Sequence, residues 1–339
     1  MFILGVGAAY PEQVLSNQDL AVLGLALQTD EHQFLERCGV QARRVSLPMP
    51  YISETKNKDV VAARSHATVS PSALAVSAIQ QALVRAGISI EQVGLLLADT
   101  ATPYQTCPSE AQRIGGLLGI KVPAYDVVSG SGTVPHYLEM ISSWKPERVP
   151  EYVLCVSTNT PSQHTSFSGK ALSAYLLGDA ATAVVISLRQ PGKLRVESSF
   201  VRKRKVQKPA IVVEGHADID ISLLPDGAEL EAEIAQSVKQ LLAARNDDRT
   251  GCFFVGPQLF AAQSAAIAVK AGFAQDRIVS VVSNCGYALG SSIGCALSSI
   301  WDGVESGQGI VVIHGGDGAW SGSLLLVSQD EGRASCCIS

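Results

Sequence analysis

The sequence predicts an α/β fold built from two similar halves. Of the 339 residues, 47% are hydrophobic and 17% are charged, which is the balance of a well-packed globular protein. Apolar runs of strand length alternate with longer stretches of helical periodicity. Several of these runs are continuously apolar, as in strands covered on both faces. A similar succession of helices and strands occurs twice, which indicates a duplication.

The first half is expected to contain five strands and at least two helices. Its apolar runs are residues 2–8, 93–101, 124–128, 152–158 and 181–188. A helix is predicted over 70–87, because Ser70 followed by Pro71 is a typical helix start and Gly87 a typical end. A second helix, 109–119, has an apolar face at helical spacing.

The second half repeats this pattern. Its predicted strands are residues 194–201, 252–256, 277–282, 309–315 and 322–328. Helices are predicted over 227–245 and 258–272, and the second is alanine-rich enough to be buried nearly all round. Pro and Gly punctuate residues 187–193 and place the join there. The predicted halves are therefore 1–190 and 191–330, followed by a flexible tail at 331–339.

Composition argues against several classes of protein. The formal net charge of −5 gives no reason to expect nucleic-acid binding, and the basic run 201–208 is interpreted as a solvated loop. The eight cysteines lack zinc-site spacing, so no metal is expected, and a reducing cytoplasm fits best. The N-terminal run turns polar too soon for a signal peptide, and no run is long enough to span a membrane.

Residues 125–136, YDVVSGSGTVPH, have the features of a turn that presents a nucleophile. A β-rich run ends at Val128, a Ser/Gly stretch follows, and the next residues can begin a helix. Ser131 then has two interpretations. It is a nucleophile, which requires an adjacent base because a hydroxyl is weakly acidic. Alternatively, it is a small polar residue at a helix start, where serine is favoured in any case.

Seven segments carry a resemblance to a known family. They are residues 10–20, 36–45, 102–120, 124–132, 176–187, 286–297 and 313–327. In order and approximate spacing, they resemble segments of beta-ketoacyl-ACP synthase III over most of the chain. The resemblance implies a thiolase-like five-layer αβαβα fold made of two similar halves, which is usually a homodimer.

The resemblance also implies which positions carry the chemistry. In that family a Cys thiolate attacks an acyl thioester, and a His and an Asn stabilise charge during decarboxylation. In this sequence the three positions hold Ser131, Pro257 and Tyr287. Proline has no titratable group and no N–H, and tyrosine is bulkier and donates one hydrogen bond. Decarboxylating condensation is therefore not expected.

Other parts of the family's binding site are partly retained. Gly315 and Gly316 match the glycine-rich loop whose backbone helps build the oxyanion site. Arg37 stands where the family has an arginine near the phosphates of coenzyme A. The aromatic residue that stacks on adenine is replaced by Gln33 or His32, depending on a one-residue gap, which puts coenzyme A binding in question.

Two histidines lie near the predicted nucleophile in the alignment with this family. His314 occupies a position that is commonly phenylalanine beside the nucleophile. It is either a base for Ser131 or a core histidine with one hydrogen-bonded nitrogen. His136, about one helical turn after Ser131, is expected to point away from the site.

Two functions follow from these features. The first is a catalytically degenerate synthase-III-like subunit that partners an active ketosynthase in fatty-acid-derived or polyketide-type biosynthesis. The alternative is a Ser131-dependent acyltransferase that takes an acyl group from coenzyme A or acyl carrier protein without decarboxylation. Catalytic activity stays open between them. No cofactor is expected beyond a coenzyme A or phosphopantetheine thioester substrate. The expected partners are acyl carrier protein or acyl-CoA, and a second subunit that is identical or an active paralogue.

Overall fold

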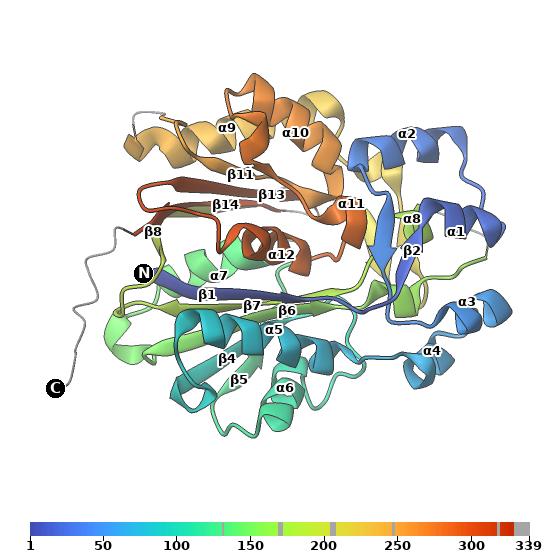
Figure 1. The fold of residues 1–339 in the computed structure, drawn as a ribbon, viewed down its shortest axis with the longest axis horizontal. Helices are drawn as coiled ribbons and strands as arrows, with labels where there is room; N and C mark the ends of the chain where they lie inside the picture. The colour runs from blue at the N-terminus through green and yellow to red at the C-terminus, as the bar shows by residue number, and fades with distance from the viewer. Residues whose placement is uncertain (131, 169–171, 204–207, 246–247, 317–318, 329–339) are drawn as a thin grey trace.

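Two stacked sheets and three helical layers form the body of the molecule. The computed structural model describes residues 1–339 except 131, 169–171, 204–207, 246–247, 317–318 and 329–339. Figure 1 shows α7 and α12 between the two sheets, α5 and α6 over the outer face of one sheet, and α9 and α10 over the other. This is the five-layer fold that the sequence predicts.

The first sheet belongs to the N-terminal half. Its strand order is β1-β7-β6-β4-β5, with antiparallel pairing at β1, β7 and β6 and parallel pairing from β6 to β5. The strands are β1 (Phe2–Ala9), β4 (Val93–Asp99), β5 (Ala124–Asp126), β6 (Tyr152–Asn159) and β7 (Ala180–Ser187). The main helices of this half are α5 (Pro71–Ala86), α6 (Glu110–Leu118) and α7 (Thr133–Ser142).

The second sheet has the same order and the same directions. It runs β8-β14-β13-β11-β12, antiparallel from β8 to β13 and parallel from β13 to β12. The strands are β8 (Leu194–Lys203), β11 (Phe253–Val255), β12 (Ile278–Val279), β13 (Gly309–Gly316) and β14 (Ala319–Val327). The helices are α9 (Gly227–Leu242), α10 (Ala261–Lys270) and α12 (Ser291–Ile300). The repeated topology supports the predicted duplication, while the boundary at residue 190 stays a proposal.

The two sheets meet through β1 and β8. The pairs Phe2–Arg195 and Ile3–Leu194 join these two strands. The ten strands therefore form one hydrogen-bonded sheet, and its two halves stack on each other. All ten strands expected from the sequence are present, with ends shifted by a few residues. One expectation is corrected in part: residues 201–203 of the basic run belong to β8 rather than to a loop. The predicted tail at 331–339 lies outside the described residues.

Shorter elements gather at one end of the layers, as Figure 1 shows. Two separate antiparallel strand pairs lie here. They are β2 (Val14–Ser16) with β3 (Ala42–Arg44) and β9 (Ile211–Val213) with β10 (Ala217–Ile219). The short α-helices are α1 (Asn17–Val22), α2 (Thr29–Cys38), α3 (Met49–Thr55), α4 (Val60–His66), α8 (Leu172–Leu176) and α11 (Val282–Cys285). The 3-10 helices are η1 (Ile90–Gln92), η2 (Pro146–Arg148), η3 (Pro161–His164), η4 (Ile221–Leu223), η5 (Ala243–Arg245), η6 (Gln258–Phe260) and η7 (Gln275–Arg277).

Helix α5 illustrates how local sequence sets both its ends and its packing. The Ser70 hydroxyl accepts a hydrogen bond from the backbone N–H of Ala73, and Gly87 ends the helix in the left-handed region at φ 66°. Both ends are as predicted. Glycines in β1 allow α5 to lie directly on the sheet: a Cβ on Gly7 would fall 2.1 Å from the Ala78 carbonyl oxygen.

Helix α10 corrects a prediction. Its alanine-rich sequence was expected to be buried nearly all round, but of its residues only Ser264, Ile267 and Ala268 are buried. The helix lies in an outer layer, so one face contacts its neighbours and the other faces solvent. Alanine content indicates a good helix former and not burial on every side.

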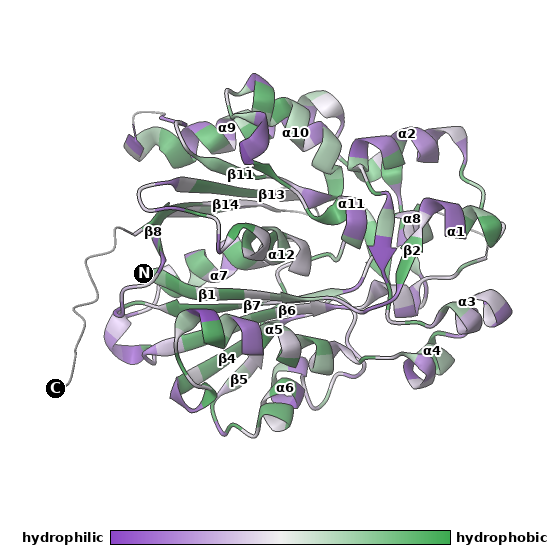
Figure 2. Cartoon of the chain, viewed as in Figure 1, coloured by the Kyte–Doolittle hydropathy of each residue, from purple (hydrophilic) through white to green (hydrophobic). Residues whose placement is uncertain are grey.

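The hydrophobic residues concentrate in the strands and in the layer between the sheets, as Figure 2 shows. Among the described residues, no single helix is long and apolar enough to cross a membrane. The helices α4 and α5 together pass the same length and composition test, but they are bent by 49° relative to each other. Much of α5 is buried, including Leu74, Ile79 and Leu83.

Candidate functional site

The loop between β5 and α7 is where the sequence predicts a nucleophile. Ser131 itself lies outside the described residues, so neither interpretation of its side chain is tested. Its neighbours form the predicted turn: Gly130 has a left-handed φ of 68°, and α7 begins at Thr133 with Gly132 at the N-cap. The position therefore lies just before the N-terminus of a ten-residue helix.

Asp99, the last residue of β4, anchors this loop. Its carboxylate accepts hydrogen bonds from the Ser129 N–H at 2.8 Å, the Thr133 hydroxyl at 3.1 Å and the Ser157 hydroxyl at 3.1 Å. Asp99 is 1% exposed, and burial raises its pKa to about 6 although these hydrogen bonds oppose the shift. A Cβ on Gly290 would fall 2.4 Å from this carboxylate, so the chain before α12 closes over it.

The sequence did not single out Asp99. The sequence feature that could have indicated Asp99 is an acidic residue at the end of an otherwise apolar strand, VGLLLAD. Asp126, the last residue of β5, anchors the same segment. Its carboxylate accepts from the backbone N–H groups of Glu110 at 3.0 Å and Ala111 at 2.7 Å. It therefore ties β5 to the N-terminus of α6, next to the loop.

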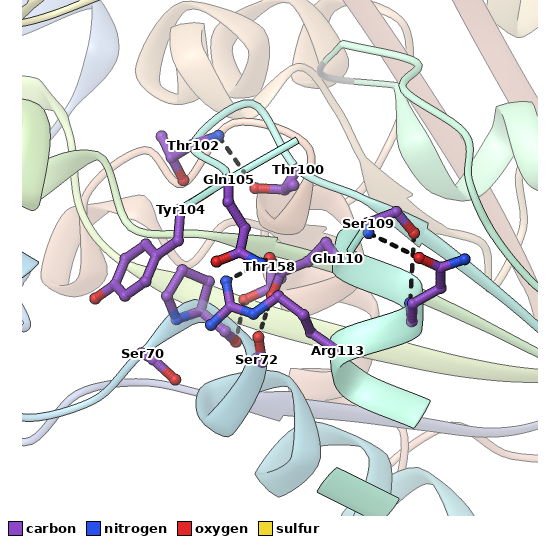
Figure 3. Close-up of polar contacts among 12 residues, drawn as sticks. Ser70, Ser72, Thr100, Thr102, Tyr104, Gln105, Ser109, Glu110, Arg113 and Thr158 are labelled. Carbon is purple, nitrogen blue, oxygen red and sulfur yellow. Dashed lines mark hydrogen bonds and ion pairs between the residues drawn. The ribbon is translucent and has the colours of Figure 1, made fainter. Parts of the chain in front are cut away.

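A polar cluster braces the chain between β4 and α6, as Figure 3 shows. The buried Glu110 carboxylate accepts from the Ser72 hydroxyl at 2.5 Å and lies 3.4 Å from the Arg113 guanidinium. The guanidinium carbons of Arg64 and Arg113 each lie 5.2 Å from the centroid of the Tyr104 ring. These contacts hold residues 100–109 beside the site without belonging to it.

His314 faces the first turn of α7 from the opposite sheet. Residues 310 and 312 of the same strand pack in the layer of α7 and α12, and the two-residue period of a strand puts His314 on that face. His314 is 4% exposed. Burial and the nearby His136 lower its pKa to about 3, so the imidazole is neutral at physiological pH.

His136 corrects the expectation that it points away. A Cβ placed on Gly132 would lie 2.6 Å from both His136 Nδ1 and Ser321 Oγ, so the His136 ring lies beside β14 at the helix start. His136 is half-buried, so its ring packs at the helix start instead of extending into solvent. Two imidazoles therefore lie next to the loop, where one was expected.

The positions that hold His and Asn in the resembling family are occupied by buried residues. Pro257 is buried and caps the 3-10 helix η6 at φ −57°. Tyr287 is 1% exposed, its N–H donates to the Leu176 carbonyl at 2.7 Å, and its carbonyl accepts from Gly178 N at 3.1 Å. Both residues are integrated into the core. Whether their presence removes catalysis stays a prediction.

Comparisons with known proteins find similar proteins and similar folds, although no protein-family profile matches the chain. Beta-ketoacyl-[acyl-carrier-protein] synthase III of Salmonella arizonae is 27% identical over 337 residues, covering 96% of this chain and 98% of that protein. The chain is thus similar to synthase III over nearly its whole length. The crystal structure of the Aquifex aeolicus 3-oxoacyl-[acyl-carrier-protein] synthase III superposes with a TM-score of 0.77 at 20% identity, covering 96% of this chain and 99% of that one. A tetronic acid condensing enzyme superposes equally well, with a TM-score of 0.77, 20% identity and the same coverage. The thiolase-like fold is thereby confirmed.

The two glycines expected in an oxyanion loop lie within a strand. Gly315 and Gly316 belong to β13, and residues 317–318 of the predicted loop lie outside the described residues. Gly315 pairs with Trp320, whose ring would lie 2.1 Å from a Cβ at residue 315. Close packing against the Trp320 ring therefore explains why residue 315 is a glycine. A role of these glycines in oxyanion binding stays a prediction.

Arg37 contacts aromatic rings. Its guanidinium carbon lies 5.3 Å from the Phe34 ring centroid and 5.6 Å from that of Phe260. Gln33 and His32, the residues at the position of the adenine-stacking aromatic, are exposed on α2. The proposed contact of Arg37 with coenzyme A or a carrier remains untested. Among the residues that the structure describes, no group of His, Cys, Asp and Glu side chains is arranged to hold a metal ion.

Proposed function

We propose that this synthase III relative is a catalytically degenerate subunit that partners an active ketosynthase in fatty-acid-derived or polyketide-type biosynthesis. In this role it binds acyl groups carried on acyl carrier protein or coenzyme A without decarboxylating condensation. One observation carries the proposal: an intact thiolase-like fold holds Pro257 and Tyr287 in its core, where the resemblance implies His and Asn.

The loss of both groups matters because decarboxylation leaves negative charge on the thioester oxygen. Catalysis requires hydrogen-bond donors aimed at that charge, and removal of a single such donor costs roughly a hundred- to a thousandfold in rate. Pro257 has no donor at all, and the buried Tyr287 has one hydroxyl on a much larger ring. Condensation by this chain alone is therefore disfavoured.

An open sheet edge supports a protein partner. Strand β5 pairs with β4 and, among the described strands, has no neighbour on its other side. Tyr125 in this strand is 58% exposed, and Val128 just after it is 66% exposed. Exposed edges with apolar side chains favour pairing with another chain. Both an identical subunit and an active paralogue satisfy this observation.

Co-expression tests the partnership. The chain, carrying the only affinity tag, is produced together with an active ketosynthase paralogue of the same organism, and the purified complex is analysed by native mass spectrometry. A heterodimer of equal stoichiometry is expected. Purification as a homodimer that takes up acyl groups covalently would refute the proposal.

A second candidate is acyl transfer by Ser131. The observation that favours it is the pair of imidazoles, His314 and His136, beside the loop that Asp99 anchors. An imidazole can accept the proton of a serine hydroxyl, although the low pKa of His314 makes it a weak base. Incubation with an acyl-CoA followed by intact-protein mass spectrometry should then show one added acyl group. Persistence of that added mass in Ser131→Ala would exclude this candidate.

A further inference from the structure

Polar side chains line part of the otherwise hydrophobic layer between α7 and the second sheet. Ser321 lies directly opposite His314 in the β13–β14 ladder, and Ser323 lies two residues further along the same face. From α7, His136 meets them at the helix start. We call His136, His314, Ser321 and Ser323 the polar face. Most of their neighbours in the layer are apolar and include Val134, Val312, Ile310 and Leu325, but Ser199 lies directly opposite Ser323 and donates to Glu139.

The two serine hydroxyls of the polar face have no partner among the described residues. Ser321 and Ser323 are both 0% exposed, and neither Oγ has a hydrogen bond within the described part of the chain. A buried polar group left unpaired costs about 1–3 kcal/mol. Such groups are rare in native proteins and call for an explanation. A ligand that carries hydrogen-bonding atoms is one explanation.

The polar face lies next to the loop where the family resemblance places the acyl group. Gly132, the N-cap of α7, is the point of contact, because a Cβ there would lie 2.6 Å from Ser321 Oγ. His136 Nδ1 donates to the Gly132 carbonyl at 2.9 Å, so Nε2 is the ring nitrogen not used in that bond. Acceptors and hydroxyl donors therefore converge at the start of the helix.

The chemistry of the polar face favours a neutral ligand. Burial and His136 keep the pKa of His314 low, so this imidazole carries no charge at physiological pH. An anionic group would be desolvated there without an opposite charge. Glu139, one turn after His136, already accepts a hydrogen bond from Ser199 and adds negative potential on that side. A hydroxyl or a carbonyl oxygen fits, because imidazole and serine together donate and accept hydrogen bonds.

We propose that the polar face binds a hydroxyl or keto oxygen on the acyl chain, so that the protein selects oxygenated acyl thioesters over plain alkyl ones. This inference rests on the proposed function, in which the chain binds acyl thioesters. It assigns His314 and Ser321 a role in specificity. A hydroxyl donates to an imidazole nitrogen and accepts from serine, and a keto oxygen accepts from serine.

Equilibrium binding of three matched probes tests the proposal. They are 3-hydroxyoctanoyl-pantetheine, 3-oxooctanoyl-pantetheine and octanoyl-pantetheine. The oxygenated probes should bind at least about tenfold more tightly than octanoyl-pantetheine, because a site built for a hydroxyl discriminates against analogues that lack it. In His314→Phe and in Ser321→Ala, the difference in Kd between the oxygenated probes and octanoyl-pantetheine should shrink to roughly threefold or less.

Ser237→Ala is the matched control. Ser237 is also 0% exposed and also has an unpartnered Oγ among the described residues, but it lies on α9 in an outer layer. This variant should keep the wild-type preference. Ser321→Ala removes one hydroxyl only, and therefore decides the question if His314→Phe lacks the wild-type circular dichroism spectrum.

The binding results distinguish a failure of the selectivity proposal from a failure of the proposed acyl-binding function. Equal affinity for the three probes, or a preference that survives in both folded variants, overturns the inference and leaves acyl binding intact. Absence of binding for every probe overturns both. Tighter binding of only one oxygenated probe supports the polar face and identifies the oxygen that it recognises.

Discussion

Asp99 is a buried carboxylate whose hydrogen bonds fix the loop that precedes α7. Three donors surround it, but its burial outweighs them and raises its pKa to about 6 from an ordinary value of 3.8. The folded state therefore binds this proton more tightly than the unfolded state does. Between pH 4 and pH 7 the contribution of Asp99 to stability falls as the pH rises, by at most about 1.4 kcal/mol per pH unit.

Asp99→Asn should remove this contribution. The free energy of unfolding of the wild type minus that of the variant is expected to decrease from pH 4.5 to pH 7, measured by urea titration at each pH. The difference between the two proteins isolates Asp99 from other titrating groups such as Asp179, whose pKa burial also raises to about 6. An increase of the difference with pH would mean that the hydrogen bonds outweigh burial.

The residues of the site differ in how well the sequence predicted them. Pro257 and Tyr287 were found from the resemblance, because they occupy identifiable positions in long matching segments. The orientation of His136 was predicted wrongly, because helical periodicity does not show that its ring folds back over Gly132 toward β14. Asp99 was missed, because a single aspartate at a strand end has no motif. Its role appears only when three segments distant in sequence meet around it.

At the scale of elements, α5 packs on β1 through glycine. A Cβ on Gly7 would fall 2.1 Å from the Ala78 carbonyl oxygen and 2.7 Å from the Ala82 nitrogen, both backbone atoms that cannot rotate away. Gly7→Ala should therefore force the helix off the strand and lower the free energy of unfolding by about 3 kcal/mol, measured by chemical denaturation.

Gly116→Ala is the matched control for that substitution. Gly116 lies within α6, and a Cβ there would have no neighbour within 4 Å. Alanine is the better helix former, so this change should raise stability by roughly 0.5–1 kcal/mol. If both variants lose stability equally, close packing at Gly7 is not the cause.

The elements that the sequence predicted well are those with local signals. Helix α5 has a serine N-cap, a proline in its first turn and a terminal glycine, and its observed limits match the prediction closely. The sequence of helix α10 does not show which of its faces is buried, because alanine is common on both buried and exposed helix faces. The short strands β2 and β3 pair across 26 or more residues of chain, and periodicity over three residues does not predict them.

At the scale of the whole molecule, the two halves share one topology, and the first half has an exposed edge. Tyr125→Lys on that edge should weaken association with the second subunit by at least about tenfold, since aromatic residues dominate interfaces and lysine disfavours edge pairing. Analytical ultracentrifugation of the complex measures this. Val84→Lys on α5, where valine is 81% exposed, is the control and should have no effect.

We propose that this thiolase-like chain does not perform decarboxylating condensation by itself. Release of labelled carbon dioxide from malonyl-acyl carrier protein, in the presence of an acyl-CoA, tests it most directly. The purified chain should release no more than a protein-free control, while an active synthase III releases label under the same conditions. Release by this chain that Ser131→Ala abolishes would contradict the account.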